Sequence, residues 1–276
     1  MSINRYVKQL RDSYREDKKA FIFFSVLRVL VLLTLVRCLF TKNYQSAALC
    51  VLTLVLFLVP AFVQDKLKLS IPPVFQMIIF GFIFAAEILG EVNHYYVRIP
   101  GWDTMLHTMN GFLCAAVGFS LVYLLNRGSK NVNLSPFYLT LVAFCFSMTI
   151  GVLWEFFEFT MDQFFFLDMQ KDFIVQGFGS VTLDPAQMGT PIHVSEIVDT
   201  AIHTASGQSY SIPGGYLDIG ILDTMKDLLV NLAGAIVFSI IGYSTLKYSK
   251  SSKVADSLMI KPNDVPQEES SEGNHD

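Results

Sequence analysis

The chain is poor in charged residues, which make up only 16% of its 276 amino acids. Hydrophobic residues make up 52%, and they are gathered in long blocks rather than spread along the chain as in a soluble domain. The small net charge of -4 and the lack of a basic patch interleaved with aromatics exclude the usual nucleic-acid-binding surface. The sequence therefore predicts a protein whose main environment is a lipid bilayer.

Several signatures of enzymes and of processing are also missing. There is no HExxH helix, and no Ser–His or Cys–His pattern for nucleophilic catalysis. No small-residue cleavage site follows the first apolar block, and neither a myristoylation glycine nor a prenylation box is present. We therefore expect the first block to be retained as a membrane helix. Cysteine is scarce and confined to apolar blocks, which favours buried thiols over a disulfide framework, at Cys38, Cys50, Cys114 and Cys145.

Six apolar blocks have the length of a membrane-spanning helix, roughly 17–25 residues. They cover residues 21–40, 47–63, 74–91, 105–125, 137–157 and 219–243. Lysine and arginine are concentrated in alternate connecting segments, as the positive-inside rule requires when both termini are cytoplasmic. The sequence thus predicts an all-α polytopic membrane helix bundle with six transmembrane helices and both termini inside.

This topology divides the chain into three parts. Residues 1–20 form a cytoplasmic N-terminal segment, residues 21–243 form the membrane domain, and residues 244–276 form a cytoplasmic, largely disordered tail. The membrane domain includes one long extracytoplasmic loop, over residues 160–217. Within the loop, residues 197–204 and 209–212 alternate around a polar Ala-Ser-Gly-Gln turn, which predicts a small β-hairpin.

Acidic and histidine residues gather at the helix ends that this topology places outside. The sixth block opens with Asp223, Asp227 and Asn231, whose spacing of four puts them on one helix face. Small residues continue several such stripes deeper into the bilayer, so we expect the polar faces to point into the bundle. The third to sixth helices would then enclose an outward-facing acidic pocket. The other outward ends contribute Glu87, Glu91, Asp103, His107, Asn110, Glu155 and Glu158.

Several carboxylates in a poorly hydrated pocket cannot all stay ionised without compensation. Either some are protonated, or cations occupy the pocket. Carboxylates with one imidazole suit a divalent ion such as Mn²⁺, Mg²⁺, Ca²⁺ or Zn²⁺. The predicted metal ligands are His107, Glu155, Glu158, Asp223 and Asp227. The remaining predicted pocket residues are Glu87, Glu91, Asp103, Asn110 and Asn231.

Three kinds of function stay open at this point. An outward pocket can bind a divalent cation or handle protons, in transport, sensing or envelope stress. Alternatively, His107 and the paired carboxylates can hold a metal-bound water in a membrane-embedded hydrolase or transferase acting on an envelope lipid. In the third case the polar groups only specify helix packing or are solvated at the interface, and His107 is simply the partner of Asp103 one turn away.

Three segments carry a resemblance to a known family. They are residues 102–111 (WDTMLHTMNG), 147–158 (SMTIGVLWEFFE) and 216–231 (YLDIGILDTMKDLLVN). These segments are similar to the YjdF-like family of bacterial multi-pass membrane proteins, over the third to the sixth helix. The order His, Glu-x-x-Glu, Asp-x-x-x-Asp-x-x-x-Asn also resembles VanZ-like membrane proteins at the level of pattern. The resemblance implies a bacterial plasma membrane and assigns no catalytic residue.

Overall fold

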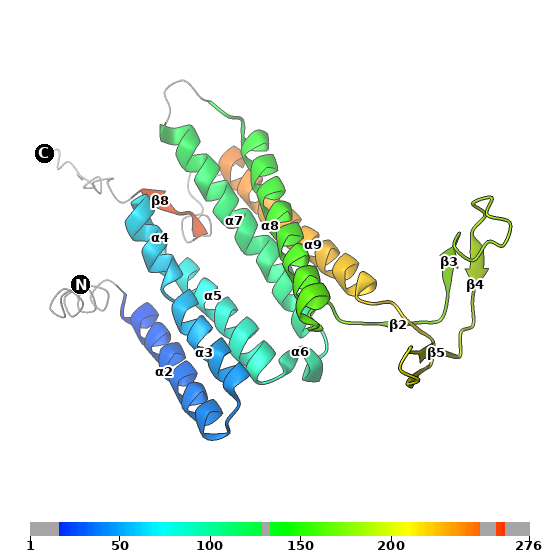
Figure 1. The fold of residues 1–276 in the computed structure, drawn as a ribbon. Coiled ribbons are helices and arrows are strands. Elements are labelled where there is room, and N and C mark those ends of the chain that lie inside the picture. The colour runs from blue at the N-terminus through cyan, green and yellow to red at the C-terminus, as the bar shows by residue number, and fades with distance from the viewer. Residues whose placement is uncertain (1–16, 129–132, 249–257, 263–276) are drawn as a thin grey trace, which may run out of the picture. The chain divides into compact units, whose positions relative to one another are not determined.

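The computed structural model describes residues 17–128, 133–248 and 258–262, and helices dominate this part of the chain (Figure 1). The helices are α2 (Lys18–Phe40), α3 (Tyr44–Leu56), α4 (Val59–Leu67), α5 (Pro73–Ile83), the π-helix η1 (Phe84–Val92), α6 (Tyr95–Arg98), α7 (Trp102–Gly128), α8 (Pro136–Phe165) and α9 (Ile221–Tyr248). The strands are β1 (Leu69–Ser70), β2 (Ile174–Val175), β3 (Phe178–Ser180), β4 (Ile192–Val194), β5 (Asp199–His203), β6 (Ser209–Pro213), β7 (Tyr216–Leu217) and β8 (Lys261–Pro262).

Six helical stretches have the length and apolar composition of membrane spans, which confirms the predicted number. They are Lys18–Phe40, Tyr44–Lys66, Pro73–Val92, Trp102–Asn126, Pro136–Phe165 and Ile221–Tyr248. The second is interrupted between α3 and α4, because Pro60 has no N–H to donate to the preceding turn. The chain is a multi-pass integral membrane protein with small two-stranded sheets.

The helix starts follow ordinary capping chemistry. The carboxylate of Asp17 accepts the N–H groups of Lys19 and Ala20 at the start of α2, and Asn43 accepts the N–H of Ser46 at the start of α3. Pro73 begins α5, at a position where a missing N–H costs nothing. Short polar turns therefore end one span and begin the next.

The chain divides into two compact units, and each is described by itself. The first contains residues 1–149 and 230–276, and the second contains residues 150–229. Helices α8 and α9 are continuous, and each contributes residues to both units.

The first unit has two apolar cores. One packs α2, α3, α5 and η1 around Val31, Cys50 and Phe57. The other packs α5, α7, α8 and α9 around Phe75 and Phe119. Small residues on α7, α8 and α9 lie in these contacts, as the sequence predicts. Fully buried examples are Ala115, Ala143, Ser147 and Ala235.

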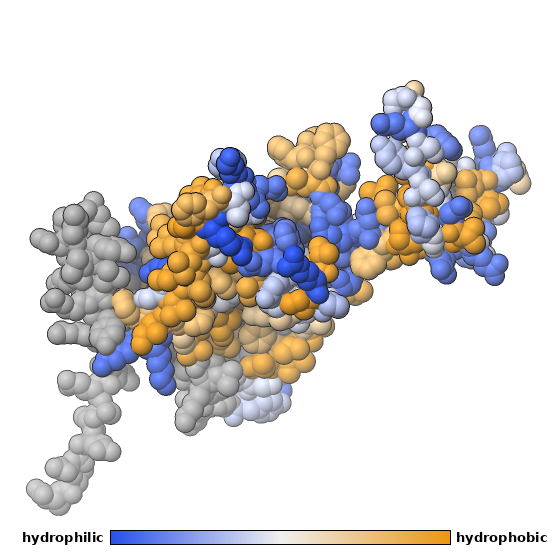
Figure 2. Space-filling model, turned by 90° about the horizontal axis from the view of Figure 1, so that it is seen from below, coloured by the Kyte–Doolittle hydropathy of each residue, from blue (hydrophilic) through white to orange (hydrophobic). Residues whose placement is uncertain are grey.

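Large apolar side chains also cover the outside of the helices, where Figure 2 shows broad hydrophobic surface. Leu33, Phe62 and Leu125 are 61%, 61% and 72% exposed. A soluble monomer rarely exposes such continuous apolar area. This surface is the one that lipid chains contact.

The same fact corrects the prediction that the cysteines are buried. All four are free; Cys38 and Cys50 are buried, Cys114 is half-buried and Cys145 is exposed. An apolar block does not imply burial in a membrane protein, because lipid solvates one side of each helix.

In the second unit, the loop between α8 and α9 is built from three short antiparallel ladders. Strands β5 and β6 pair with Ile202 opposite Tyr210, which confirms the predicted hairpin. The ladders β2–β7 and β3–β4 lie outside the prediction. Their strands are two or three residues long, too short to show an alternating pattern.

Most of the predicted N-terminal segment and tail lies outside the described residues. Within the tail, α9 continues to Tyr248, and residues 258–262 are described. There β8 pairs antiparallel with β1, Leu69 lying opposite Pro262. Figure 1 shows β8 beside α4. The C-terminal segment and the α4–α5 turn are therefore at the same end of the helices.

Candidate functional site

Two asparagines join α7 to α9 within the first unit. Nδ2 of Asn110 donates to Oδ1 of Asn231 at 3.0 Å. Asn231 is 1% exposed, and its own Nδ2 lies 3.6 Å from Sδ of Met148 on α8. Both asparagines belong to the predicted pocket, and the structure brings them together.

Glycines allow the backbones of α7 and α9 to approach each other beside this hydrogen bond. A Cβ atom on Gly111 would overlap the carbonyl group of Asn231, lying 2.8 Å from its carbon. A Cβ on Gly234 would lie 2.9 Å from the backbone nitrogen of Phe112. The hydroxyl of Ser147 on α8 donates to the carbonyl oxygen of Gly111 at 2.7 Å. Three helices therefore meet at Gly111.

The predicted ligand His107 forms a pair with Asp103, one turn earlier on α7. Nε2 of His107 lies 3.4 Å from Oδ1 of Asp103, and the side chains are 11% and 25% exposed. Trp102 fixes the start of α7, since its ring packs on Tyr95 at 5.0 Å and its Nε1 donates to the carbonyl of Ala85. The carboxylate can thus orient the imidazole, as a ligand or a general base requires.

Glu87 and Glu91 lie in the π-helix η1. Glu87 is half-buried and Glu91 is exposed. Just after η1, Arg37 of α2 donates to Oδ1 of Asn93 at 3.2 Å. Single π-turns are rare and recur at functional sites, but of this pair only Glu87 is withdrawn from the surface.

The second unit holds the other four predicted ligands, and all of them are buried. Glu155 and Glu158 on α8 are 4% and 7% exposed, and Asp223 and Asp227 on α9 are 4% and 1% exposed. Residues 150–229 contain eleven aspartates and glutamates but only two lysines and no arginine. The unit is therefore strongly acidic, although the whole chain has a net charge of only -4.

One lysine and one indole contact these carboxylates. Nζ of Lys226 lies 3.6 Å from Oδ1 of Asp223 and 3.8 Å from Oδ1 of Asp227. Nε1 of Trp154 donates to Oε1 of Glu158 at 2.8 Å. The i,i+4 spacing of Trp154 and Glu158 on α8 makes this hydrogen bond available.

The end of α8 and the start of α9 are clasped by residues that follow α8. The carboxylate of Asp162 accepts the N–H of Gln170 at 2.8 Å. The side chain of Gln170 donates to Oγ1 of Thr224 at 2.6 Å, and the N–H of Lys171 donates to Asp223 at 2.8 Å. We call these five residues the clasp. Sequence reasoning does not find it, because its hydrogen bonds depend on the path of an irregular segment.

Two further aspartates organise the loop. Asp218 accepts the N–H of Phe173 at 2.7 Å and that of Leu222 at 2.9 Å, and so caps the first turn of α9. Asp184 is 7% exposed and accepts the N–H groups of Ala186, Met188 and Thr190. These backbone donors hold the pKa of Asp184 below its ordinary value. An aspartate two residues before a turn is a typical sequence signal for such a site.

The surrounding carboxylates change the pKa of Asp172, which lies in the loop beyond the membrane spans. Partial burial, together with repulsion from the carboxylates of Asp168, Asp218 and Asp162, raises the pKa of Asp172 above its ordinary value of 3.8. A negative charge at Asp172 is therefore less favourable in the folded loop than in water.

Replacing Asp172 by asparagine is expected to stabilise the protein at neutral pH. The folded state binds the Asp172 proton more tightly than the unfolded state, so ionisation above an ordinary pKa of 3.8 favours unfolding. The gain in thermal midpoint should be seen at neutral pH and vanish below the ordinary pKa. Glu196→Gln, an exposed change of the same charge in the same loop, serves as the control. An equal gain from both variants would contradict a local effect at Asp172.

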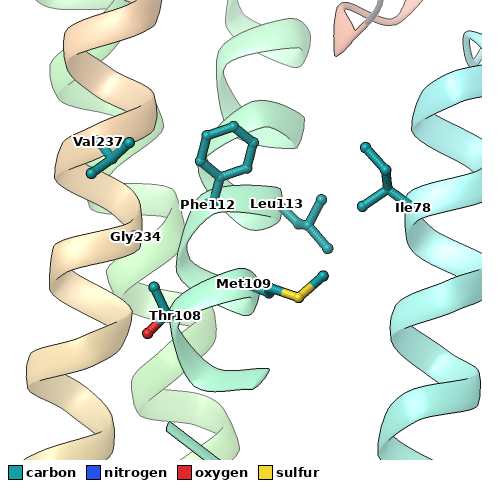
Figure 3. Close-up of a pocket in the computed structure, with 7 residues that line it drawn as sticks. All are labelled: Ile78, Thr108, Met109, Phe112, Leu113, Gly234 and Val237. Atoms are coloured by element: carbon teal, nitrogen blue, oxygen red, sulfur yellow. The ribbon is translucent and has the colours of Figure 1, made fainter. Parts of the chain in front are cut away.

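An apolar pocket of about 260 Å³ lies between α5, α7 and α9 in the first unit (Figure 3). No carboxylate lines it, and the hydroxyl of Thr108 is already bonded to the carbonyl of Thr104 at 2.7 Å. This pocket offers nothing to a cation. Its lining residues are Ile78, Thr108, Met109, Phe112, Leu113, Gly234 and Val237.

The polar geometry described above lies within a segment that matches a known family. No curated protein and no solved structure matches the chain. A family model described as "Predicted membrane protein (DUF2238)" matches residues 23–248, which include α3 to α9 and nearly all of α2. The chain therefore belongs to the DUF2238 family of membrane proteins.

Proposed function

We propose that the protein binds a divalent cation through buried carboxylates at the extracytoplasmic ends of α8 and α9. The observation that carries this proposal is the charge of the second unit, where eleven acidic residues face two lysines and the four acids of α8 and α9 named above are at most 7% exposed. Burying like charges is costly unless a counter-ion compensates them. A divalent cation with oxygen ligands supplies that compensation.

The clasp supports Glu158 and Asp227 as the central ligand pair. Helix α8 ends at the clasp and α9 begins there, so both helices lead away from it. Glu158 lies one turn before Asp162 on α8, and Asp227 lies one turn after Asp223 on α9. Glu155 is three residues from Glu158 and shares its face. We therefore propose that these carboxylates of α8 and α9 supply the oxygen ligands.

Lys226 is the competing source of compensation. Its ammonium group lies within 4 Å of both Asp223 and Asp227 but is 40% exposed at the side chain. One lysine cannot neutralise four carboxylates. We therefore assign it to the rim of the site, where it would limit the net charge before a cation binds.

His107 is the proposed nitrogen ligand. Within the first unit, His107 lies on α7 one turn before Gly111, the residue packed on Asn231. The Asp103 carboxylate would fix the orientation of the imidazole. A mixed set of carboxylates and one imidazole favours Mn²⁺ or Zn²⁺ over Ca²⁺.

The proposed setting is a bacterial plasma membrane, and the proposed role of the site is transport, sensing or a response to envelope stress. The likeness to the YjdF-like proteins, and the looser one to VanZ-like proteins, supports this setting. As an alternative within this proposal, the same carboxylates bind protons, which then compensate the charge in place of the metal.

The test is elemental analysis of protein purified from cells supplied in turn with manganese, magnesium, calcium and zinc. We expect the wild type to retain stoichiometric metal and Glu158→Gln with Asp227→Asn to retain none, because two central ligands are lost. Glu196→Gln with Asp199→Asn is the matched control, since it makes the same charge change at exposed positions of the same unit.

Two outcomes contradict metal binding. One is a wild type without stoichiometric metal under every supplement. The other is an equal loss of metal in the control. If the wild type also shows no proton uptake in proteoliposomes that depends on Glu155, the carboxylates serve helix packing, with Lys226 as their counter-ion.

A second function, hydrolysis or group transfer on an envelope lipid, is favoured by one observation. Nε2 of His107 lies 3.4 Å from the Asp103 carboxylate, which is the arrangement of an oriented general base. In that case His107→Gln would abolish turnover of a lipid-linked substrate while the carboxylates still retain metal. In pure cation binding, the same variant would only weaken metal retention.

A further inference from the structure

A short segment that follows the last membrane helix packs against the cytoplasmic end of the first unit. Leu258 and Ile260 in this segment are 7% and 5% exposed. They belong to the same apolar core as Ile71, Phe75 and Phe119. Two aliphatic side chains from outside the spans thus complete a core that the spans leave open.

Backbone hydrogen bonds fix this segment in register. The N–H of Ile260 donates to Oγ of Ser120 at 3.2 Å, and the same hydroxyl donates to the carbonyl of Ala116 at 2.8 Å. Ser120 is fully buried on α7. Beyond Ile260, β8 pairs with β1, Ser70 lying opposite Lys261. The segment is therefore seated specifically and not merely collapsed onto an apolar surface.

The receiving groove is held open by its own hydrogen bonds. Oε1 of Gln64 accepts the N–H of Ile71 at 3.0 Å, and Nε2 of Gln76 donates to the carbonyl of Ile71 at 2.8 Å. These side chains, from α4 and α5, fix the turn that carries β1. The backbone at Ile71 is therefore held by hydrogen bonds that do not involve the C-terminal segment.

We propose that residues 258–262 are a detachable plug that closes the cytoplasmic end of the bundle between α5 and α7. Two apolar side chains, one hydrogen bond from Ile260 and a two-residue ladder hold the plug, so its release breaks few contacts. Residues 249–257 tether it to α9 and can span at most about 30 Å. A released plug therefore stays close to its groove and rebinds readily.

The plug controls access from the cytoplasm to the apolar core of the first unit. This access does not depend on the ion site proposed outside. When it is seated, Ile71, Phe75 and Ser120 are shielded from cytoplasmic water. When it leaves, an apolar groove with one free hydroxyl acceptor is opened to the cytoplasm. The occupant of the groove is thus this chain's own segment, and its departure is the event that a cytoplasmic signal could control.

The test measures the accessibility of a cysteine placed at Ile71. The four native cysteines are replaced, and inside-out vesicles are treated with a membrane-impermeant maleimide. We expect slow but measurable labelling with the native plug, and labelling roughly tenfold faster after Ile260→Asp or removal of residues 258–276, because aliphatic burial is lost. Removal of residues 263–276 alone is the matched control and should leave the rate unchanged.

A second measurement covers variants that fail to fold. Facing residues of an antiparallel pair are close enough for a disulfide, so Ser70→Cys with Lys261→Cys should lose its free thiols on mild oxidation, and Ile260→Asp should slow this roughly tenfold. Equal labelling of native and plug-deleted protein would overturn the proposal. If the cysteine at position 71 is never labelled in the protein with the native plug, the plug does not detach. An equally large rise in the labelling rate after removal of residues 263–276 alone would also overturn the proposal.

Discussion

Gly111→Ala is expected to lower the free energy of unfolding by about 2–3 kcal/mol, as overpacking of a close contact does. The added methyl group would overlap the carbonyl group of Asn231 on α9. The obstacle is backbone, so no rotamer change removes the clash and the two helices must separate. Separation would also stretch the hydrogen bond between Asn110 and Asn231. Thermal unfolding in detergent, followed by circular dichroism, gives the measurement.

Gly81→Ala is the matched control for this prediction. Gly81 is also a helical glycine in a membrane span, but a Cβ atom there would meet only the ring of Phe23, at an ordinary contact distance of 3.8 Å. Alanine favours a helix over glycine by roughly 0.5–1 kcal/mol. We therefore expect Gly81→Ala to be neutral or stabilising, and an equal destabilisation by both variants would refute the close-contact argument.

Asn231→Leu is expected to destabilise the first unit through a lost acceptor. In the native protein, Nδ2 of Asn110 donates to Oδ1 of Asn231 at 3.0 Å. In the variant, this N–H group would have no acceptor at that position. Leaving a buried donor unsatisfied costs about 1–3 kcal/mol, although interhelical bonds in membranes are often worth only ~0.6 kcal/mol. Thermal unfolding of the single variants gives the size of the effect.

The double variant Asn110→Leu with Asn231→Leu separates the hydrogen bond from packing. If the two amides act as a pair, the double variant should lose less stability than the sum of the two single losses. Additive losses would show that each asparagine acts through its shape alone, and the polar contact would then have no role in joining α7 to α9.

Features set by composition and period are the ones that could be predicted. Six spans follow from apolar length, and the β5–β6 hairpin follows from alternation around a polar turn. The spacing of Asp223, Asp227 and Asn231 correctly marks one inward face, since all three are at most 4% exposed. Helical periodicity predicts that they share one face, and the small residues that continue the stripe predict that this face points into the bundle.

Features that depend on the path of irregular backbone could not be predicted. The clasp joins Asp162 to Gln170 and Lys171 to Asp223, contacts that no periodic pattern encodes. The backbone N–H of Ile260 donates to the hydroxyl of Ser120, and these two residues are far apart in the sequence. The exposure of Cys145 escaped prediction because an apolar block does not distinguish a protein neighbour from lipid.

The loop between α8 and α9 buries little apolar surface. Among residues 166–220, all of which the structure describes, no large apolar side chain is buried, and the loop is held by aspartates that accept backbone N–H groups. The heat-capacity change of unfolding comes from newly wetted apolar surface. Because little apolar surface would be newly wetted, we expect opening of this loop to change the heat capacity less than opening of a packed segment of the same length, and the stability of the loop to curve less with temperature.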